Sequence, residues 1–288
     1  MNRPKGAVRC KWSFYPVIPA AVLTVVITLY AVINTLTEGL GVVPELSLYK
    51  PDGGRFVRLF TDRIFIKSLV YSFYVALIST VLCVIFGMLL GYLISRTKSP
   101  VINTVCRLPF ILSYVAAGIL IYTTFSDHGV LWHMLDWFGI GRDGLSIVYS
   151  PSGAAVIILN CFKGIPFMAM STTPAFYRAL DRYPAIASNL GASPLQIAGR
   201  VVLPLVRHSA LTTALVLFNY QMFSYEGFYY LGSSTPVSLG VLAYESTLTS
   251  DLRDRSQSMA ISFVMIVMSL ITSCAYIRAM RKDRVTAR

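Results

Sequence analysis

Charged residues are scarce in this sequence. Asp, Glu, Lys and Arg make up 13% of its 288 residues, whereas a soluble domain carries about 25%. Apolar residues account for 55%, and the mean hydropathy is +0.64. Too few charges are present to cover a soluble surface, so the composition predicts a polytopic membrane protein. The net charge of +12 is then best explained by cytoplasmic loops beside anionic lipid, and we expect no nucleic-acid partner.

Enzyme and metal motifs are also missing. There is no G-x-x-x-x-G-K-[ST] sequence and no Gly-Lys dipeptide, so the chain carries no recognisable P-loop for ATP. Neither H-E-x-x-H nor G-x-S-x-G occurs, and the five cysteines show no zinc or disulfide spacing. His128 and His133 lie near Asp127 and Asp136, but their spacing fits no strong metal template. We therefore expect a chain that is not itself an enzyme and that binds neither a cofactor nor a metal ion.

Long apolar runs dominate what is present. They predict an all-α polytopic fold with six transmembrane helices, at about residues 14–36, 68–95, 106–125, 152–176, 206–224 and 259–277. The first run is longer than the apolar region of a signal peptide, usually about 7–15 residues, and no convincing cleavage site follows it. In the second run, Gly87 and Gly91 form a small-xxx-small pattern that permits close contact with another helix.

The basic residues orient these helices. With the N-terminus inside, the segments predicted to be cytoplasmic contain 16 Lys and Arg residues and the external segments contain 8. Because these residues favour the cytoplasmic side, both termini are expected there. External segment 127–144 is expected to carry a short interfacial helix, and external segment 226–255 could dip back towards the membrane. The remaining basic residue, Lys163, lies inside the fourth predicted helix.

One cytoplasmic stretch, residues 179–204, separates the fourth and fifth helices. Helix-compatible segments flank Gly191, and Pro194 opens the second segment at a position where proline is tolerated. The pair is too polar to span a bilayer, but its second segment has an apolar stripe to offer a partner, made of Leu195, Ile197, Ala198, Val201 and Val202. A positive φ or a close backbone approach is expected at Gly191, so that a bulky β-branched residue there would uncouple the partner.

This stretch resembles the cytoplasmic signature of the permease subunits of binding-protein-dependent ABC importers of the type I fold. The signature contains Glu-Ala-Ala, a glycine a few residues later, and an apolar residue before Leu-Pro near its end. The matching residues are Ala185, Ile186, Ala187, Leu190, Gly191, Ala192, Ser193, Pro194, Val202, Leu203 and Pro204. Here Ala185 stands in place of the glutamate and Ile186 in place of the first alanine.

The resemblance extends over about residues 67–278. Leu108-Pro109-Phe110 is similar to the motif that precedes the third helix in relatives, and Lys67-Ser68-Leu69 is similar to the motif that opens the second. The order of the helices and the region Tyr230-Leu231-Gly232 resemble the spermidine/putrescine, ferric-iron and thiamine branch. The chain is thereby divided into an N-terminal part at 1–66, a permease core at 67–278, and a basic cytoplasmic tail at 279–288.

The resemblance implies the partners. It implies two ATPase subunits that bind ATP and Mg, a second permease that is identical or homologous, an external substrate-binding protein, and a bacterial cytoplasmic (inner) membrane. The residues that would couple to the ATPase are Ala185, Ile186, Ala187, Gly191, Ala192, Ser193, Pro194, Leu203 and Pro204. A secondary transporter or a membrane enzyme is the alternative, but the sequence shows no strong internal repeat, no carboxylate well inside a span, and no evident catalytic cluster.

The fourth helix contains the candidate translocation path. A lysine at mid-span costs about 2.5–3.5 kcal/mol to insert, so Lys163 is expected to face a wet cavity or a partner. The residues proposed to line the path are Asn160, Lys163, Phe167, Asn219, Tyr220 and Phe223. Phe167 and Phe223 are the gate candidates, and a fixed positive charge would favour anionic or neutral polar cargo. Alternatively, Lys163 pairs with a carboxylate of the partner permease or snorkels between helices.

Overall fold

The structure is a computed structural model, and it describes residues 17–43, 48–49, 54–97, 99–137, 147–189, 191–248 and 252–286. Helices account for nearly all of these residues, and an antiparallel pair of two-residue strands, β1 (Val42–Val43) and β2 (Leu48–Tyr49), is the exception. The long helices are α1 (Val17–Gly39), α3 (Arg63–Thr97), α8 (Ala154–Asn189), α10 (Leu203–Met222) and α13 (Leu252–Thr286). The prediction of an all-α polytopic fold is confirmed.

Shorter helices connect and flank the long ones. They are α2 (Gly54–Thr61), α4 (Pro100–Val105), α5 (Leu108–Ile111), α6 (Tyr114–Phe125), α7 (Val130–Trp137), α9 (Pro194–Ile197), α11 (Glu226–Leu231) and α12 (Leu239–Leu248). A π-helical turn, η3 (Ala198–Val202), joins α9 to α10. The helix α7 corresponds to the short helix expected within segment 127–144.

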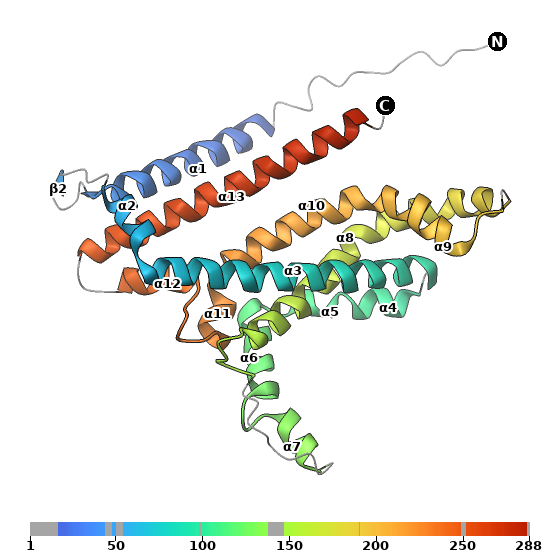
Figure 1. The fold of residues 1–288 in the computed structure, drawn as a ribbon, viewed down its shortest axis with the longest axis horizontal. Helices are drawn as coiled ribbons and strands as arrows, with labels where there is room; N and C mark the ends of the chain where they lie inside the picture. Colours follow the sequence, from blue (N-terminus) through green and yellow to red (C-terminus); the bar gives the residue numbers. More distant parts are fainter. Residues whose placement is uncertain are drawn as a thin grey trace.

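The long helices form two groups that run roughly parallel (Figure 1). Helices α1 and α13 lie side by side, and α3, α8 and α10 pack together beneath them. The start of α1, the end of α3, the turn between α8 and α9, and the end of α13 all lie towards the same end of the bundle. This arrangement agrees with the sequence-based topology, in which these segments share one side of the membrane.

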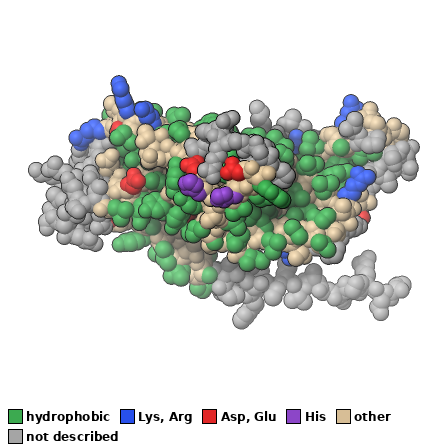
Figure 2. Space-filling model, turned by 90° about the horizontal axis from the view of Figure 1, so that it is seen from below, with side chains coloured by type: hydrophobic (Ala, Val, Ile, Leu, Met, Phe, Trp, Pro, Cys, Tyr) green, Lys and Arg blue, Asp and Glu red, His purple; other side chains and the backbone are tan. Residues whose placement is uncertain are grey.

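Five helices are long and apolar enough to cross a membrane, and a bent pair raises the number to six among the described residues. The membrane-crossing part of α1 buries none of its residues, as expected for a helix that faces lipid. Figure 2 shows apolar side chains over most of one face, with Lys and Arg mainly towards its two ends. Such a surface suits a bilayer rather than water.

The prediction of one continuous helix at 106–125, the third span, is wrong. The chain forms α4 and α5, breaks, and continues as α6 after a bend of 98° between 101–111 and 114–134. Figure 1 shows α6 and α7 turning away from the axis of the bundle. Hydropathy alone could not reveal this bend, because apolar residues continue on both sides of it.

Other helix ends also differ from the predicted ones. Helix α3 begins five residues before Ser68, and α8 continues well beyond Phe176, so that it forms the first half of the 179–204 stretch. Helix α10 begins at Leu203 directly after η3, with Pro204 near its start. The amide of Leu203 donates to the Ala198 carbonyl of η3, and Pro204, which has no amide hydrogen to donate, follows it.

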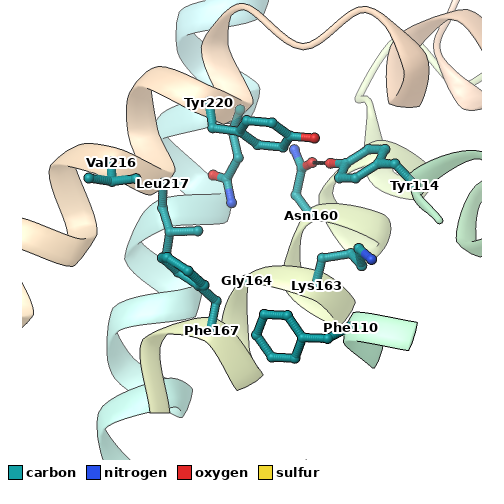
Figure 3. A pocket seen from close by; sticks show the side chains of 10 residues that line it. Phe110, Tyr114, Asn160, Lys163, Gly164, Phe167, Val216, Leu217 and Tyr220 are labelled. Atoms are coloured by element: carbon teal, nitrogen blue, oxygen red, sulfur yellow. Dashed lines mark hydrogen bonds between the residues drawn. The ribbon is translucent and has the colours of Figure 1, made fainter. Parts of the chain in front are cut away.

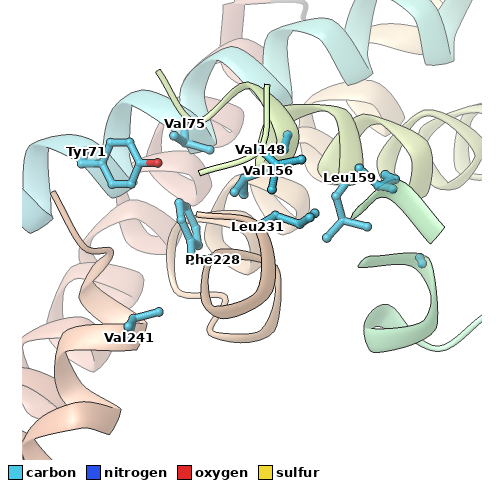
Figure 4. Packing of buried hydrophobic residues seen from close by; sticks show 11 residues of the cluster. Tyr71, Val75, Val148, Val156, Leu159, Phe228, Leu231 and Val241 are labelled. Carbon is cyan, nitrogen blue, oxygen red and sulfur yellow. The ribbon is translucent and has the colours of Figure 1, made fainter. Parts of the chain in front are cut away.

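Segment 226–255 is not simply an external loop. Helix α11 packs Phe228 and Leu231 into the largest buried cluster, against Tyr71 and Val75 of α3 and Leu159 of α8 (Figure 4). Helix α12 buries further residues against α3 and α13. The described part of this segment therefore packs on the bundle, because burial there removes its apolar side chains from water.

A close contact between two long helices follows the small-xxx-small pattern. A Cβ atom added to Gly87 would lie 2.5 Å from the Met168 side chain, and one added to Gly91 would lie 3.0 Å from the Ala169 carbonyl oxygen. The two glycines therefore allow α3 and α8 to approach at backbone distance. This packing places the polar face of α8 against α3 and α10.

Candidate functional site

A cavity of about 240 Å³ lies beside the break in the third span, between α5, α6, α8 and α10 (Figure 3). The residues that line it are Phe110, Tyr114, Asn160, Lys163, Gly164, Phe167, Val216, Leu217, Tyr220 and Gln221. Four of the six path candidates are among them, namely Asn160, Lys163, Phe167 and Tyr220. The structure thus brings together residues from two predicted helices and adds a wall from the third span that was not foreseen.

The Lys163 side chain binds two backbone carbonyl groups of the third span. Its Nζ donates to the carbonyl oxygen of Pro109 at 2.8 Å and to that of Leu112 at 2.6 Å. These carbonyls lie where the third span breaks, so the helix does not supply its usual donors. A mid-span lysine costs about 2.5–3.5 kcal/mol to insert, while each hydrogen bond from a charged donor contributes about 1.5–3 kcal/mol. The two bonds are therefore enough to offset the insertion cost.

The other side of the same break is capped locally. Ser113 precedes α6 with an extended backbone, and its Oγ accepts from the amide of Ala116 at 3.1 Å. A serine in this position is a common N-cap, because it satisfies one of the first free amides of a helix. The break therefore has a donor from α8 for its carbonyls and an acceptor from its own chain for its amides.

A layer of polar side chains crosses the bundle next to the cavity. Asn160 is almost fully buried; its Oδ1 accepts from the Tyr114 hydroxyl, and its Nδ2 donates to Ser79 Oγ at 3.4 Å (Figure 3). Thr80 Oγ1 donates to the side-chain oxygen of Gln221 at 3.0 Å. These bonds link α3, α6, α8 and α10, and buried polar groups of this kind are stable only when partnered.

Aromatic rings close two sides of the cavity. Phe110 of α5 and Phe167 of α8 have ring centroids 6.3 Å apart, and Tyr114 and Tyr220 meet edge to face at 5.6 Å. Glu226, at the start of α11, lies close enough to interact electrostatically with Lys163. The lining is thus mainly aromatic and apolar, with a small number of polar groups, as is typical of small-molecule sites.

Two predicted path residues lie elsewhere. Asn219 faces α13, where its Oδ1 accepts from Thr272 at 2.9 Å, and its Nδ2 donates to the Leu215 carbonyl at 3.1 Å. Phe223 follows the last residue of α10 and does not line the cavity. Of the three path candidates on α10, the cavity lining includes Tyr220 but not Asn219 or Phe223, and the side of α10 that carries Asn219 packs against α13.

Sequence reasoning missed Phe110, Tyr114 and Gln221 as lining residues. Phe110 was visible only as part of the motif before the third helix, and Tyr114 follows the break that hydropathy concealed. Gln221 did give a signal, since a glutamine within an apolar helix is expected to have a polar partner. Identifying that partner as Thr80 of α3 required the tertiary structure.

The turn between α8 and α9 has a well-defined local geometry. Gly191 has φ +81°, and the amide of Ala192 donates to the carbonyl of Ala187 at 3.0 Å. This is a Schellman ending, in which a left-handed residue lets the chain satisfy the last carbonyls of a helix. The positive φ expected at Gly191 is confirmed, but the close approach is not, because nothing lies within 4 Å of an added Cβ.

A capping box begins the next helix. The Ser193 amide donates to Gln196 Oε1 at 3.0 Å, and the Gln196 amide donates to Ser193 Oγ at 3.4 Å. This reciprocal pair satisfies two free amides at the start of α9. The Ser-x-x-Gln spacing in the sequence is typical of such a box.

The coupling candidates occupy both sides of this turn. Gly191 and Ser193 are exposed, Ala187 and Ala192 are half-buried, and Leu203 and Pro204 are exposed at the start of α10. Residues whose side chains lie outside the described part of the structure are Ala185, Ile186 and Pro194. The apolar stripe is only partly free for a partner, because Val202 and Ile197 pack against Ala175, Phe176 and Ala179 of α8.

Residues 83–282 match a family described as the binding-protein-dependent transport system inner membrane component. The chain belongs to this family. The match includes α8, the turn at Gly191, α10 and all ten residues that line the cavity. The protein is thus a multi-pass membrane component of an inner-membrane transport system, and its composition and hydropathy had predicted the multi-pass membrane class.

Several curated permeases are similar in sequence. The probable sulfate transport system permease protein cysT of Marchantia polymorpha is 26% identical over 203 residues, covering 68% of this chain and 67% of that protein. The molybdenum transport system permease protein ModB of Mycobacterium tuberculosis is 29% identical over 170 residues, covering 58% and 62%. CysW, a sulfate transport system permease protein of Synechocystis, is 29% identical over 196 residues, covering 67% and 66%. The chain therefore aligns with about two thirds or less of the length of these relatives.

A solved structure shows the same fold. It is a chain from the crystal structure of a bacterial alginate ABC transporter in complex with an alginate pentasaccharide-bound periplasmic protein, with a TM-score of 0.74 and 19% identity over 96% of each chain. The expected ABC importer permease fold is confirmed. The narrower resemblance to the spermidine/putrescine, ferric-iron and thiamine branch is not confirmed, because these relatives belong to sulfate and molybdenum systems.

Proposed function

We propose that this chain is the permease subunit of an ABC importer and that its cavity is part of the route by which a small solute reaches the cytoplasm. Family membership across residues 83–282 is the observation that carries the proposal. The chain would work with a second permease, two ATPase subunits that bind ATP and Mg, and an external binding protein. Both termini and the Gly191 turn would lie on the cytoplasmic side.

The structure suggests how the ATPase could act on the cavity. Helix α8 is continuous from the turn to Asn160 and Lys163, and α10 continues from η3 to Tyr220 and Gln221. The turn between them is held by the Schellman ending at Gly191 and by the capping box of Ser193. A displacement of this turn would therefore move two walls of the cavity together, since helices transmit force along their axes with little internal change.

The cargo is proposed to be anionic or neutral and polar. Lys163 places a positive charge beside the cavity, and the amide groups of Asn160 and Gln221 lie next to it. Two of the relatives are named as permeases of sulfate transport systems, and sulfate is an anion of suitable size for a cavity of about 240 Å³. Glu226 lies near enough to weaken the positive potential, so a neutral polar solute remains compatible with the site.

Reconstitution in proteoliposomes tests the function. The purified chain should hydrolyse no ATP by itself, and uptake of labelled sulfate should need the ATPase subunits, ATP and the external binding protein. A set of labelled anions and neutral polar solutes should then be compared under the same conditions. Robust ATP hydrolysis by the isolated chain would overturn the proposal, and so would ATP-independent uptake driven by an ion gradient.

A further inference from the structure

Three contacts along α8 hold the two arms of the bent third span. Asn160 accepts from Tyr114 at the start of α6. One turn further on, Lys163 binds the carbonyls of Pro109 and Leu112 at the break itself. One turn beyond that, Phe167 faces Phe110 of α5. Because these contacts follow one another on one face of one helix, α8 acts as a template for the bend.

Lys163 makes the central contact of the three. Its two acceptors are separated along the chain by Phe110 and Ile111, so fixing both carbonyls also fixes the direction in which α5 ends. An ammonium group can serve both because it has three donors on a flexible stem. In Figure 3 the Lys163 side chain extends towards the third span, beside Phe110 and Tyr114.

We propose that Lys163 is a positioning residue for the cavity: it holds the break of the third span so that Phe110 closes one side against Phe167. The lysine acts through the backbone of α5, which is separate from any electrostatic effect on the cargo. Without the lysine, the carbonyls at the break would need other donors. Inside a membrane the donors at hand are backbone amides, and these reach the carbonyls if the helix straightens. That this contact controls passage rests on the proposed function, whereas the bend itself does not.

The experiment measures the bend directly. Nitroxide labels are attached at Val101→Cys and Met134→Cys, at the far ends of the two arms, where the side chains are 67% and 55% exposed. The full-length chain is assembled in lipid nanodiscs after replacement of its native cysteines by alanine, and pulsed electron paramagnetic resonance gives the distance distribution. Straightening the span would lengthen this distance by on the order of 10 Å, since each helical residue adds about 1.5 Å.

The variants separate charge, geometry and background effects. Lys163→Met should move or broaden the distribution towards longer distances, whereas Lys163→Arg, which keeps charged donors, should retain the distribution of the parent chain. Lys67→Met is the matched control, because it removes an exposed lysine at the start of α3, away from the cavity. Its distribution should be unchanged.

The proposal is overturned if Lys163→Met and Lys67→Met give the same narrow distribution. If the Lys163→Met chain does not accumulate in membranes, Lys163→Gln is measured instead against the same control and the same criterion. The measurement needs neither ATP nor cargo. A lengthened distance together with absent ATP-driven uptake by the parent complex would count against the proposed function alone, while an unchanged distance with intact uptake would count against the positioning role alone.

Discussion

Two helix breaks in this protein satisfy the backbone carbonyls at their helix ends in different ways and in different surroundings. At the α8–α9 turn, Gly191 adopts a positive φ and the Ala192 amide satisfies a carbonyl of the preceding helix. At the α5–α6 break, backbone carbonyls are satisfied by Lys163, more than 50 residues away along the chain. The first break is exposed at one end of the bundle, and the second lies beside a cavity inside it.

The difference between the two breaks shows when a helix break depends on local sequence and when it depends on a distant segment. In water, unsatisfied backbone groups can bind solvent, so local conformational preference is enough to end a helix. Inside a membrane each unsatisfied group costs several kcal/mol, so a break needs a donor supplied by the protein. The turn at Gly191 is therefore visible in the sequence, while the break near Leu112 is visible only with α8 in place.

The largest effect is expected from Lys163→Met. Removal of two charge-assisted hydrogen bonds, each contributing about 1.5–3 kcal/mol, should displace Phe110 and reduce ATP-driven uptake by about tenfold or more. Assembly with the ATPase subunits and basal ATP hydrolysis should survive. Initial rates of uptake in proteoliposomes give the comparison, with Lys163→Arg expected to recover most of the rate. Unchanged uptake would show that transport does not depend on this tertiary donor.

A smaller effect is expected from Gly191→Val. A β-branched residue held at a positive φ costs about 1–3 kcal/mol, so the turn should distort and uptake should fall while membrane insertion stays normal. Gly199→Val is the matched control, because an added Cβ has no neighbour within 4 Å at either position but only Gly191 has a positive φ. Equal uptake by the two variants would contradict the view that local backbone conformation sets this break.

Ser113→Ala tests the locally capped side of the intramembrane break. Loss of an N-cap side chain costs about 1 kcal/mol, and the stability of the chain in nanodiscs should fall by that amount. Thr123→Ala, also on α6, removes a hydroxyl that binds only a carbonyl within its own helix, and it should have little effect. Thermal unfolding followed by circular dichroism provides the measurement, and identical midpoints for the two variants would argue against the cap.

The smallest effect is expected from Ser193→Ala at the exposed turn. Its capping bond to Gln196 can be replaced by water, so the cost should be about 0.5 kcal/mol, at the low end for N-caps. The difference between Ser113→Ala and Ser193→Ala in the same unfolding experiment sharpens the comparison between the two breaks. If Ser193→Ala lowered the stability more than Ser113→Ala, the result would contradict the expectation that a cap contributes more inside the membrane than at the exposed turn.

Much of the architecture could be predicted from single segments. The predicted apolar runs overlap the five long helices and the bent pair among the described residues, and Gly87 and Gly91 correctly indicated close helix packing. Errors occurred where one helix face has two possible neighbours: Asn219 was expected in the cavity but packs against α13 through Thr272. Periodicity shows that two residues share a face, but it does not show which helix that face meets.

The sequence by itself determined the membrane class, the family and the exposed turn at Gly191, because composition, hydropathy and local backbone preference act within short stretches of chain. Only the tertiary structure decided the bend of the third span, the pairing of Phe110 with Phe167, and the partners of Lys163. The physical reason is that a membrane interior offers no water to a broken helix. The groups that complete its hydrogen bonds must therefore come from segments distant in sequence, and their identity is settled by packing.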